Sequence, residues 1–382
     1  MLQEKILNRF LRYVKICTES CKKNGQTPTT EGQWELANVL YEELSRLGIT
    51  DLTLTKNCYL IARIPSNTVK PSGVIGFMAH LDTAEGVSGK NVKPVVKKNA
   101  DGKTIIESGG GTLLGADDKA GIAIIVSAAE YIINHPEIEH CALELIFTPD
   151  EETGKGLPCF PAEEIHSSIC YTVDGGPEPE LEIECFNAYS VAVAFTGKPV
   201  HPGYARGILI NAALMAAVYA SMLPRNESPE ATDGRYGYYG VTEISGTEDA
   251  AVVNLILRDF SKEGVERRLA ALKSFAAAVE AQFPGGKASV EAKLTYRNMR
   301  EKIEENPKAI DNLKQAAKRI GVPFNLKPIR GGTDGARLAE LGVPAPNIWT
   351  GGRNFHSREE WVALDEMETA CRLVIELTAF CG

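Results

Sequence analysis

Residues 74–82, VIGFMAHLD, run from an uninterrupted apolar stretch directly into a histidine and an aspartate. A short apolar run of this kind is typical of a strand buried within a sheet. Three later runs share the design: LELIFT leads towards Glu151, ICYTV leads into Asp174, and PNIWT comes shortly before His356. Because open α/β sheets place ligands beyond the carboxyl ends of their strands, we expect these polar side chains to meet in one crevice.

Helical and strand patterns alternate through the first half of the chain. Residues 34–48 have apolar positions at helical spacing and stop at Gly48, and residues 51–64 then alternate as a single strand would. A further helix with one apolar stripe follows Asp117 and Asp118, where a carboxylate is also a favourable helix cap. This order is typical of an α/β domain.

From about residue 187 the order of the patterns changes. Strand-like, helical, two strand-like, helical and strand-like segments follow one another as far as residue 296. This β-α-β-β-α-β order predicts a ferredoxin-like α+β module inserted into the first domain. The predicted boundaries are 1–186 and 297–382 for the two parts of the first domain, and 187–296 for the insert.

Composition and charge exclude several classes of partner. The chain has 382 residues and a formal net charge of −9, with no basic run that could follow a phosphate backbone, so we expect no nucleic acid. No apolar segment approaches the roughly 20 residues that span a bilayer, and the charged N-terminus does not resemble a signal peptide, so we expect no membrane. The nine scattered cysteines do not form a compact disulfide framework, which favours reduced thiols and a cytoplasmic location.

Two histidines and three carboxylates after these strands predict a metal site. Singly, each has a simpler explanation, such as a helix cap for Asp117. Together they offer nitrogen and oxygen donors without a thiolate, which suits zinc first, with cobalt or manganese as alternatives. Asp117 could bridge two divalent cations, because a carboxylate has two oxygens. The predicted ligands are His80, Asp117, Glu152, Asp174 and His356.

Asp82 and Glu151 are predicted to support the metals without binding them. Asp82 lies two residues after His80, where its carboxylate can reach the far ring nitrogen of the histidine and orient the ring. Glu151 can take a proton from water that the metals have made more acidic, and can return it to a leaving amine. We therefore predict amide hydrolysis with Glu151 as the general base.

Long stretches along the chain also carry a family resemblance. They include HLDTAEGVSGKNVKP, TLLGADDKAGIA, TPDEETGKG, YTVDGG and RGGTDGARLAELGVPAPNIWTGGRNFHS. With these stretches the chain resembles, over almost its whole length, the peptidase T tripeptidases and their relatives among the co-catalytic zinc peptidases. The resemblance implies a catalytic domain with a mixed central sheet flanked by helices, a lid inserted into it, and a homodimer formed through that lid. It also implies a cis peptide bond between Asp117 and Asp118, and removal of the N-terminal residue from short peptides, especially tripeptides.

Three substrate contacts are implied by the resemblance alone. His201, in a VHPG stretch, would stabilise the transition state. Arg258 in LRDF and Arg330 in RGGTDG would bind a substrate carboxylate, although a structural ion pair is the alternative for each. The connection between His80 and Asp117 is shorter than in peptidase T enzymes, so strict tripeptide specificity does not follow from the resemblance.

Other functions stay open at this point. A dipeptidase, a carboxypeptidase or an N-acyl amino acid amidohydrolase would use the same scaffold, and a non-catalytic metal-binding relative would keep the fold alone. A nucleotide-binding oxidoreductase is disfavoured, because the glycines at 109–115 do not match the G-x-G-x-x-G spacing and the third position falls on Leu114.

Overall fold

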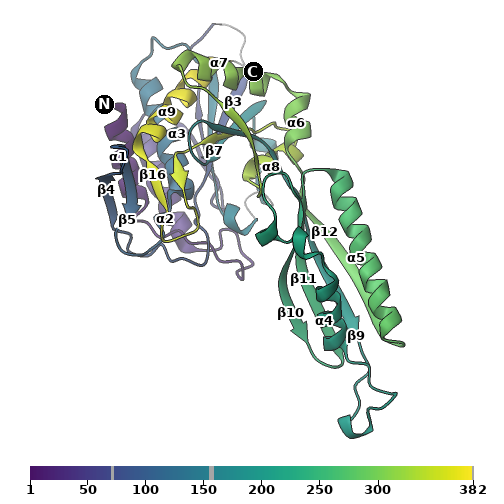
Figure 1. The fold of residues 1–382 in the computed structure, drawn as a ribbon. Helices are drawn as coiled ribbons and strands as arrows, with labels where there is room; N and C mark the ends of the chain where they lie inside the picture. Colours follow the sequence, from purple (N-terminus) through teal and green to yellow (C-terminus); the bar gives the residue numbers. More distant parts are fainter. Residues whose placement is uncertain (70–72, 155–158, 381–382) are drawn as a thin grey trace. The chain divides into compact units, whose positions relative to one another are not determined.

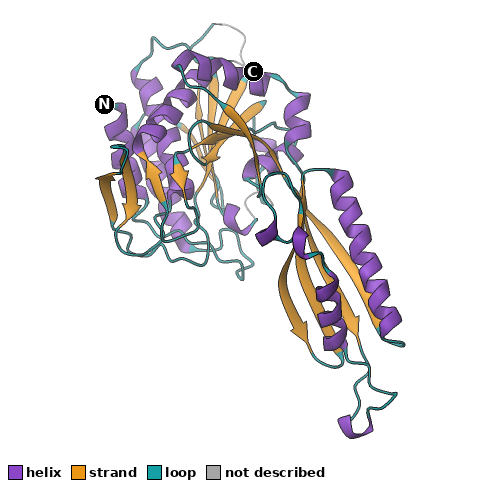
Figure 2. Ribbon diagram, in the orientation of Figure 1, coloured by secondary structure: helices purple, strands orange, loops and turns teal. Residues whose placement is uncertain are grey.

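The computed structural model describes residues 1–69, 73–154 and 159–380, which divide into two compact units (Figures 1 and 2). The larger unit contains Met1–Ile183, Met299–Lys327 and Thr333–Gly382, and the smaller unit contains Glu184–Asn298 and Pro328–Gly332. None of the helices in the described ranges combines the length and apolar character needed to cross a bilayer.

A mixed sheet of eight strands lies at the centre of the larger unit. The strand order is β1-β2-β6-β3-β7-β14-β8-β13. The strands are β1 (Asp51–Leu54), β2 (Leu60–Ile64), β3 (Val74–His80), β6 (Ala142–Thr148), β7 (Ile169–Gly175), β8 (Glu180–Cys185), β13 (Asn325–Ile329) and β14 (Asn347–Trp349). Strand β3 pairs in parallel with β6 and β7, whereas β2 pairs antiparallel with β6. The sheet is therefore mixed, as predicted.

Helices flank this sheet (Figure 2). They are α1 (Leu2–Tyr13), α2 (Glu31–Arg46), α3 (Ala116–Asn134), α6 (Arg300–Glu305), α7 (Lys308–Ile320), α8 (Asp334–Glu340) and α9 (Leu364–Leu377). Helices α1, α3 and α9 pack against one another, and α3 also packs on β3 and β7. Strands β3, β6 and β7 are buried along almost their whole length, which explains their uninterrupted apolar runs. Because these three strands are parallel, their carboxyl ends lie along one edge of the sheet.

Residues 51–64, predicted as one strand, form a hairpin instead. Strand β1 pairs antiparallel with β2, and Asp51 lies opposite Arg63. The backbone N–H of Thr55 donates to the carbonyl of Tyr59 at 2.9 Å, and Cys58 has a left-handed φ of 68°. The prediction was wrong because alternation of side chains continues through a tight turn that only the backbone reveals.

A second sheet of the larger unit was not predicted. Its order is β15-β16-β5-β4, formed by β4 (Pro94–Lys98), β5 (Thr104–Ser108), β15 (Gly352–Arg353) and β16 (Trp361–Ala363). Strand β4 is largely exposed, so it has no apolar pattern to reveal it. His356 lies in the loop between β15 and β16, which places it on this sheet and not directly after β14.

The smaller unit has the ferredoxin-like fold. Its elements are β9 (Asn187–Thr196), α4 (Ala212–Met222), β10 (Tyr238–Gly246), β11 (Ala250–Asp259), α5 (Lys262–Gln282) and β12 (Lys287–Tyr296). The strand order is β10-β11-β9-β12, with every neighbouring pair antiparallel. Val193, Phe195, Leu255 and Leu272 are buried in its separate core. The predicted β-α-β-β-α-β order is therefore confirmed.

Candidate metal centre

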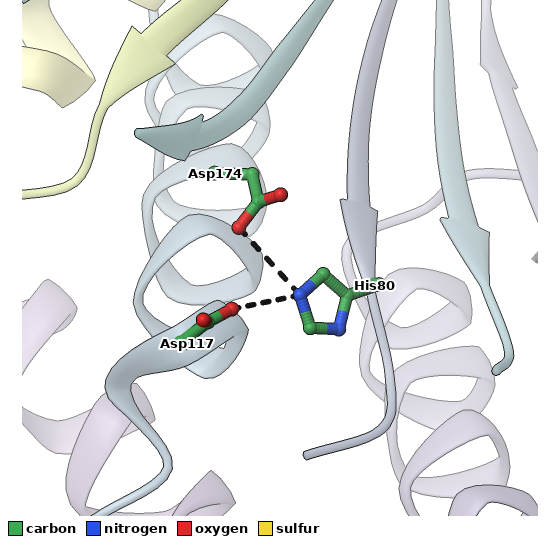
Figure 3. A group of neighbouring side chains, drawn as sticks. All are labelled: His80, Asp117 and Asp174. Carbon is green, nitrogen blue, oxygen red and sulfur yellow. Dashed lines mark hydrogen bonds and ion pairs between the residues drawn. The ribbon is translucent and has the colours of Figure 1, made fainter. Parts of the chain in front are cut away.

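The end of β3 brings His80 beside two carboxylates from distant parts of the chain (Figure 3). Nε2 of His80 lies 2.8 Å from Oδ1 of Asp117 and 3.5 Å from Oδ1 of Asp174. Asp117 comes from the first turn of α3 and Asp174 from the end of β7. One nitrogen and two oxygens therefore converge within 4.8 Å of one another, close enough to share one metal ion.

A second group of possible ligands adjoins the first. Nε2 of His356 lies 2.8 Å from Oε1 of Glu152 and 3.1 Å from Oδ2 of Asp117. Asp117 thus faces His80 with one carboxylate oxygen and His356 with the other. The structure brings all five predicted ligands together, and the aspartate common to both groups is the residue predicted to bridge.

The charges of this cluster fit a site for divalent cations. Burial raises the pKa of Asp174 to about 7, and burial together with the nearby Asp117 raises the pKa of Glu152. Hydrogen bonds with Asp117 and Glu152 raise the pKa of His356 to about 10. Protons are therefore held between these groups in the metal-free protein. Hard oxygen donors and imidazole nitrogens in such an arrangement are ligands that zinc, cobalt and manganese accept.

Asp82 contacts both His80 and the acidic segment after β6. Nδ1 of His80 donates to the backbone carbonyl of Asp82 at 3.1 Å and lies 3.4 Å from its Oδ1. Because a carbonyl oxygen only accepts, Nδ1 of His80 carries the hydrogen. Nε2 is then the ring nitrogen that faces Asp117 and Asp174. The Asp82 carboxylate itself accepts from the backbone N–H groups of Glu151, at 2.9 Å, and Glu152, at 3.2 Å. The sequence predicted a contact of the Asp82 carboxylate with His80, but neither the hydrogen bond to the Asp82 carbonyl nor those from the acidic segment.

Glu151 lies next to the ligand groups without belonging to either. Removal from water raises the pKa of its carboxyl well above the usual range, and the Asp174 and Asp334 carboxylates add to this effect. A raised pKa brings a carboxylate closer to the range in which it can both take and return a proton near neutrality. Asp334 was not among the predicted site residues.

A buried hydrogen-bond network at the acidic segment 150–152 was also not predicted from the sequence. Asp150 is fully buried and accepts from the backbone N–H of Thr29, at 2.9 Å, and from Nε2 of Gln33, at 2.8 Å. Its own N–H donates to Oε1 of Gln33 at 3.0 Å. Asp150, Glu151 and Glu152 look alike in the sequence, and only the fold shows that the first is structural.

The peptide bond between Asp117 and Asp118 is cis, as the resemblance implied. Asp118 is fully buried and accepts from the backbone N–H of Gly121 at 3.1 Å, which is the helix-capping role considered for it. It also accepts from the backbone N–H of His80 at 3.2 Å. Asp118 therefore joins the start of α3 to the end of β3, and leaves Asp117 to face the histidines.

The three predicted substrate contacts belong to the smaller unit. His201 is exposed, and its Nδ1 accepts from the backbone N–H of Gly203. Arg258 donates to two backbone carbonyls of its own sheet. Arg330 donates from both terminal nitrogens to backbone carbonyls of the loop 232–236. Both arginines thus have structural partners, and their contact with a substrate stays a prediction.

Comparison with known proteins identifies the relatives of this fold. Residues 76–379 match the model described as Peptidase family M20/M25/M40. A peptidase T from Geobacillus thermodenitrificans is 41% identical over 402 residues, covering 98% of each chain. Two solved structures are similar. The aminopeptidase PepT from Bacillus cereus has a TM-score of 0.81 and 24% identity, and the match covers 98% of each chain. The YXEP protein of Bacillus subtilis, a dinuclear metal-binding peptidase of the M20 family, has a TM-score of 0.69 and 16% identity, and the match covers 99% of this chain and 97% of that one.

The fold and the sequence match define this protein as a metallopeptidase. More narrowly, the chain belongs to peptidase family M20/M25/M40.

Proposed function

We propose that this metallopeptidase removes the N-terminal residue of short peptides, tripeptides above all, with two divalent cations. The observation that carries the proposal is Asp117, whose two carboxylate oxygens face His80 and His356 separately. Relatives named peptidase T, and the likeness to an aminopeptidase structure, support the choice of substrate. The likeness to a dinuclear metal-binding peptidase supports the number of cations.

The two ligand groups would each hold one cation. These groups are His80, Asp117 and Asp174, and Asp117, Glu152 and His356. Zinc is the first choice for such nitrogen and oxygen donors, with cobalt or manganese as alternatives. When bound, divalent cations act as Lewis acids that polarise a carbonyl and make water more acidic. The protein itself aligns the ligand side chains, and the protons held between them in the metal-free protein would leave as the cations bind.

Glu151 would act as the general base. It is close enough to both ligand groups to be influenced by their charges, yet its own oxygens are not needed as ligands. It would take the proton of the attacking water and deliver it to the leaving amine, with the raised pKa of its carboxyl helping it to hold the proton between the two steps. Asp82 would fix the position of this base through the hydrogen bond from the Glu151 N–H.

His201, Arg258 and Arg330 are proposed to contact the substrate. His201 would stabilise the developing oxyanion, and the arginines would bind the peptide carboxylate. Arg330 would have to exchange some of its carbonyl partners in the loop 232–236 for that carboxylate. The proposal also includes a cytoplasmic homodimer formed through the smaller unit, on the resemblance to peptidase T.

A peptide-length profile on metal-loaded protein tests the proposal. Di-, tri- and tetrapeptides with the same N-terminal residue are incubated with protein loaded with zinc, cobalt or manganese, and the released residue is identified. We expect fastest release of the N-terminal residue from the tripeptide, and no cleavage of the same tripeptide when it is N-acetylated.

Each alternative function predicts a different product. Faster cleavage of the acetylated peptide would indicate an amidohydrolase, and release of the C-terminal residue would indicate a carboxypeptidase. Preference for dipeptides would indicate a dipeptidase. Absence of turnover with all three metals would refute a peptidase and leave a metal-binding protein.

A further inference from the structure

A buried glutamate outside the predicted set connects the two segments that supply Asp117 and His356. Glu360 is fully buried and lies four residues after His356, at the end of the loop between β15 and β16. Its Oε2 accepts from the backbone N–H groups of Leu114, at 3.0 Å, and Gly115, at 2.7 Å. Its Oε1 accepts from the N–H of Asp117 itself, at 3.1 Å.

This arrangement fixes the backbone of Asp117 against the loop that carries His356. Three N–H groups of one short segment point at a single carboxylate, and hydrogen bonds to an ionised acceptor are among the strongest in proteins. Gly115 has a left-handed φ of 79°, which allows the segment to turn its N–H groups inward. A small movement of this carboxylate would therefore shift Asp117 relative to His356.

The His356 loop has hydrogen bonds within itself and an anchor at each end. His356 is 50% exposed, so packing alone does not hold its ring. The start of the loop is anchored by Arg353, which pairs with both oxygens of Glu366 at 2.8 Å. Glu360 is the corresponding anchor at the end of the loop, and it alone of these anchors contacts the Asp117 segment.

We propose that Glu360 is a positioning residue for the second cation, holding Asp117 and His356 at the separation that the ion requires. The inference rests on the proposed function, because it assumes that Asp117, Glu152 and His356 bind a cation. It goes further by naming the group that sets the geometry of those ligands without touching the ion. Groups of this kind typically change metal affinity by about 10- to 100-fold when they are replaced.

The variant Glu360→Gln tests this role. Glutamine has the same size, but its amide nitrogen would face one of the three backbone N–H groups, and the negative charge would be lost. Zinc binding to metal-free protein is measured by calorimetry, with His356→Ala as the reference that identifies the second site. We expect two sites in the natural protein and a 10- to 100-fold weaker second site in Glu360→Gln. The first site shares Asp117 but not the His356 loop, so it should weaken less.

Glu144→Gln is the matched control, because Glu144 is also fully buried and also accepts from backbone amides. Glu144 lies near the start of β6, at the opposite end of that strand from Glu152, and it accepts from the N–H groups of His166 and Ser167 and from Nε of Arg63. We expect this control to lower the unfolding temperature while both cations bind as in the natural protein.

The outcomes separate this inference from the proposed function. A natural protein that binds fewer than two cations overturns the proposed function and this inference with it. If the natural protein binds two cations and Glu360→Gln binds both with unchanged zinc affinity, the inference alone is overturned. An equal loss of zinc affinity at both sites also overturns it. If Glu360→Gln does not fold, Glu360→Asp replaces it, because the shorter side chain keeps the charge but cannot reach all three N–H groups. The second site of this variant should again bind zinc more weakly. Unchanged zinc affinity at both sites would overturn the inference.

Discussion

Replacement of Asp82 by asparagine is expected to weaken both the fold and the site. Asp82 is fully buried, and its two oxygens accept from the backbone N–H groups of Glu151 and Glu152 at 2.9 and 3.2 Å. Asparagine has nearly the same size but only one acceptor oxygen. Its amide nitrogen would face one of these N–H groups, and the negative charge 3.4 Å from Nδ1 of His80 would disappear.

The size of the effect follows from these contacts. A buried N–H that loses its acceptor costs about 1–3 kcal/mol, and the remaining hydrogen bond loses about 1 kcal/mol when its acceptor is no longer charged. We therefore expect the free energy of unfolding of the metal-free protein to fall by about 2–4 kcal/mol. We expect the lost hydrogen bond to let Glu151 move by about 1 Å, and a displacement of that size at a catalytic group can cost about 100-fold in rate. The kcat on a tripeptide should therefore fall by about 100-fold at saturating metal.

Denaturant unfolding and steady-state turnover measure the two effects separately. Asp51→Asn is the control, because Asp51 is an exposed aspartate whose carboxylate lies 3.4 Å from Arg63 on the neighbouring strand. Its unfolding free energy should change by no more than about 0.5 kcal/mol, and its turnover should not change. If Asp82→Asn keeps natural stability and natural kcat, the carboxylate does not hold this segment and the reasoning is refuted.

Two further predictions concern the base and the ligands. Glu151→Gln should retain both cations and lose about 10²- to 10⁴-fold in turnover. Metal analysis measures the bound cations, and a variant that turns over peptide at the natural rate would contradict the role of Glu151 as base. Because hydrogen bonds with Asp117 and Glu152 raise the pKa of His356 to about 10, its ring is protonated at neutral pH and an incoming cation must displace that proton. Cation affinity should therefore rise as the pH increases towards about 10. Calorimetry in buffers of different ionisation heat would detect the released proton as a binding heat that depends on the buffer. Equal binding heats in all buffers would contradict this prediction.

The positions of several predicted ligands follow from strand burial, which the sequence records directly. Strands β3 and β7 are covered on both faces, so their apolar runs are continuous, and His80 and Asp174 mark where the runs stop. The position of the His356 loop could not be predicted in this way, because it belongs to a second sheet with short or exposed strands. Residues that act through long-range contacts were equally hidden: the hydrogen bond from Asp117 to Glu360 spans 243 positions, and no local pattern indicates it.

Three carboxylates that point at backbone amides explain how the ligand side chains stay free to bind cations. Asp82 accepts from the segment of Glu151, Asp118 accepts from the N–H of His80, and Glu360 accepts from the N–H of Asp117. Each fixes a ligand or the base through its main chain, and the hydrogen bond from Nδ1 of His80 to the Asp82 carbonyl leaves Nε2 free for a cation. The cost is a concentration of buried negative charge beside the ligand carboxylates, which ion pairs with histidine offset only in part. Bound cations would offset the remainder, so the residues that position the ligands also increase the affinity of the site for positive charge.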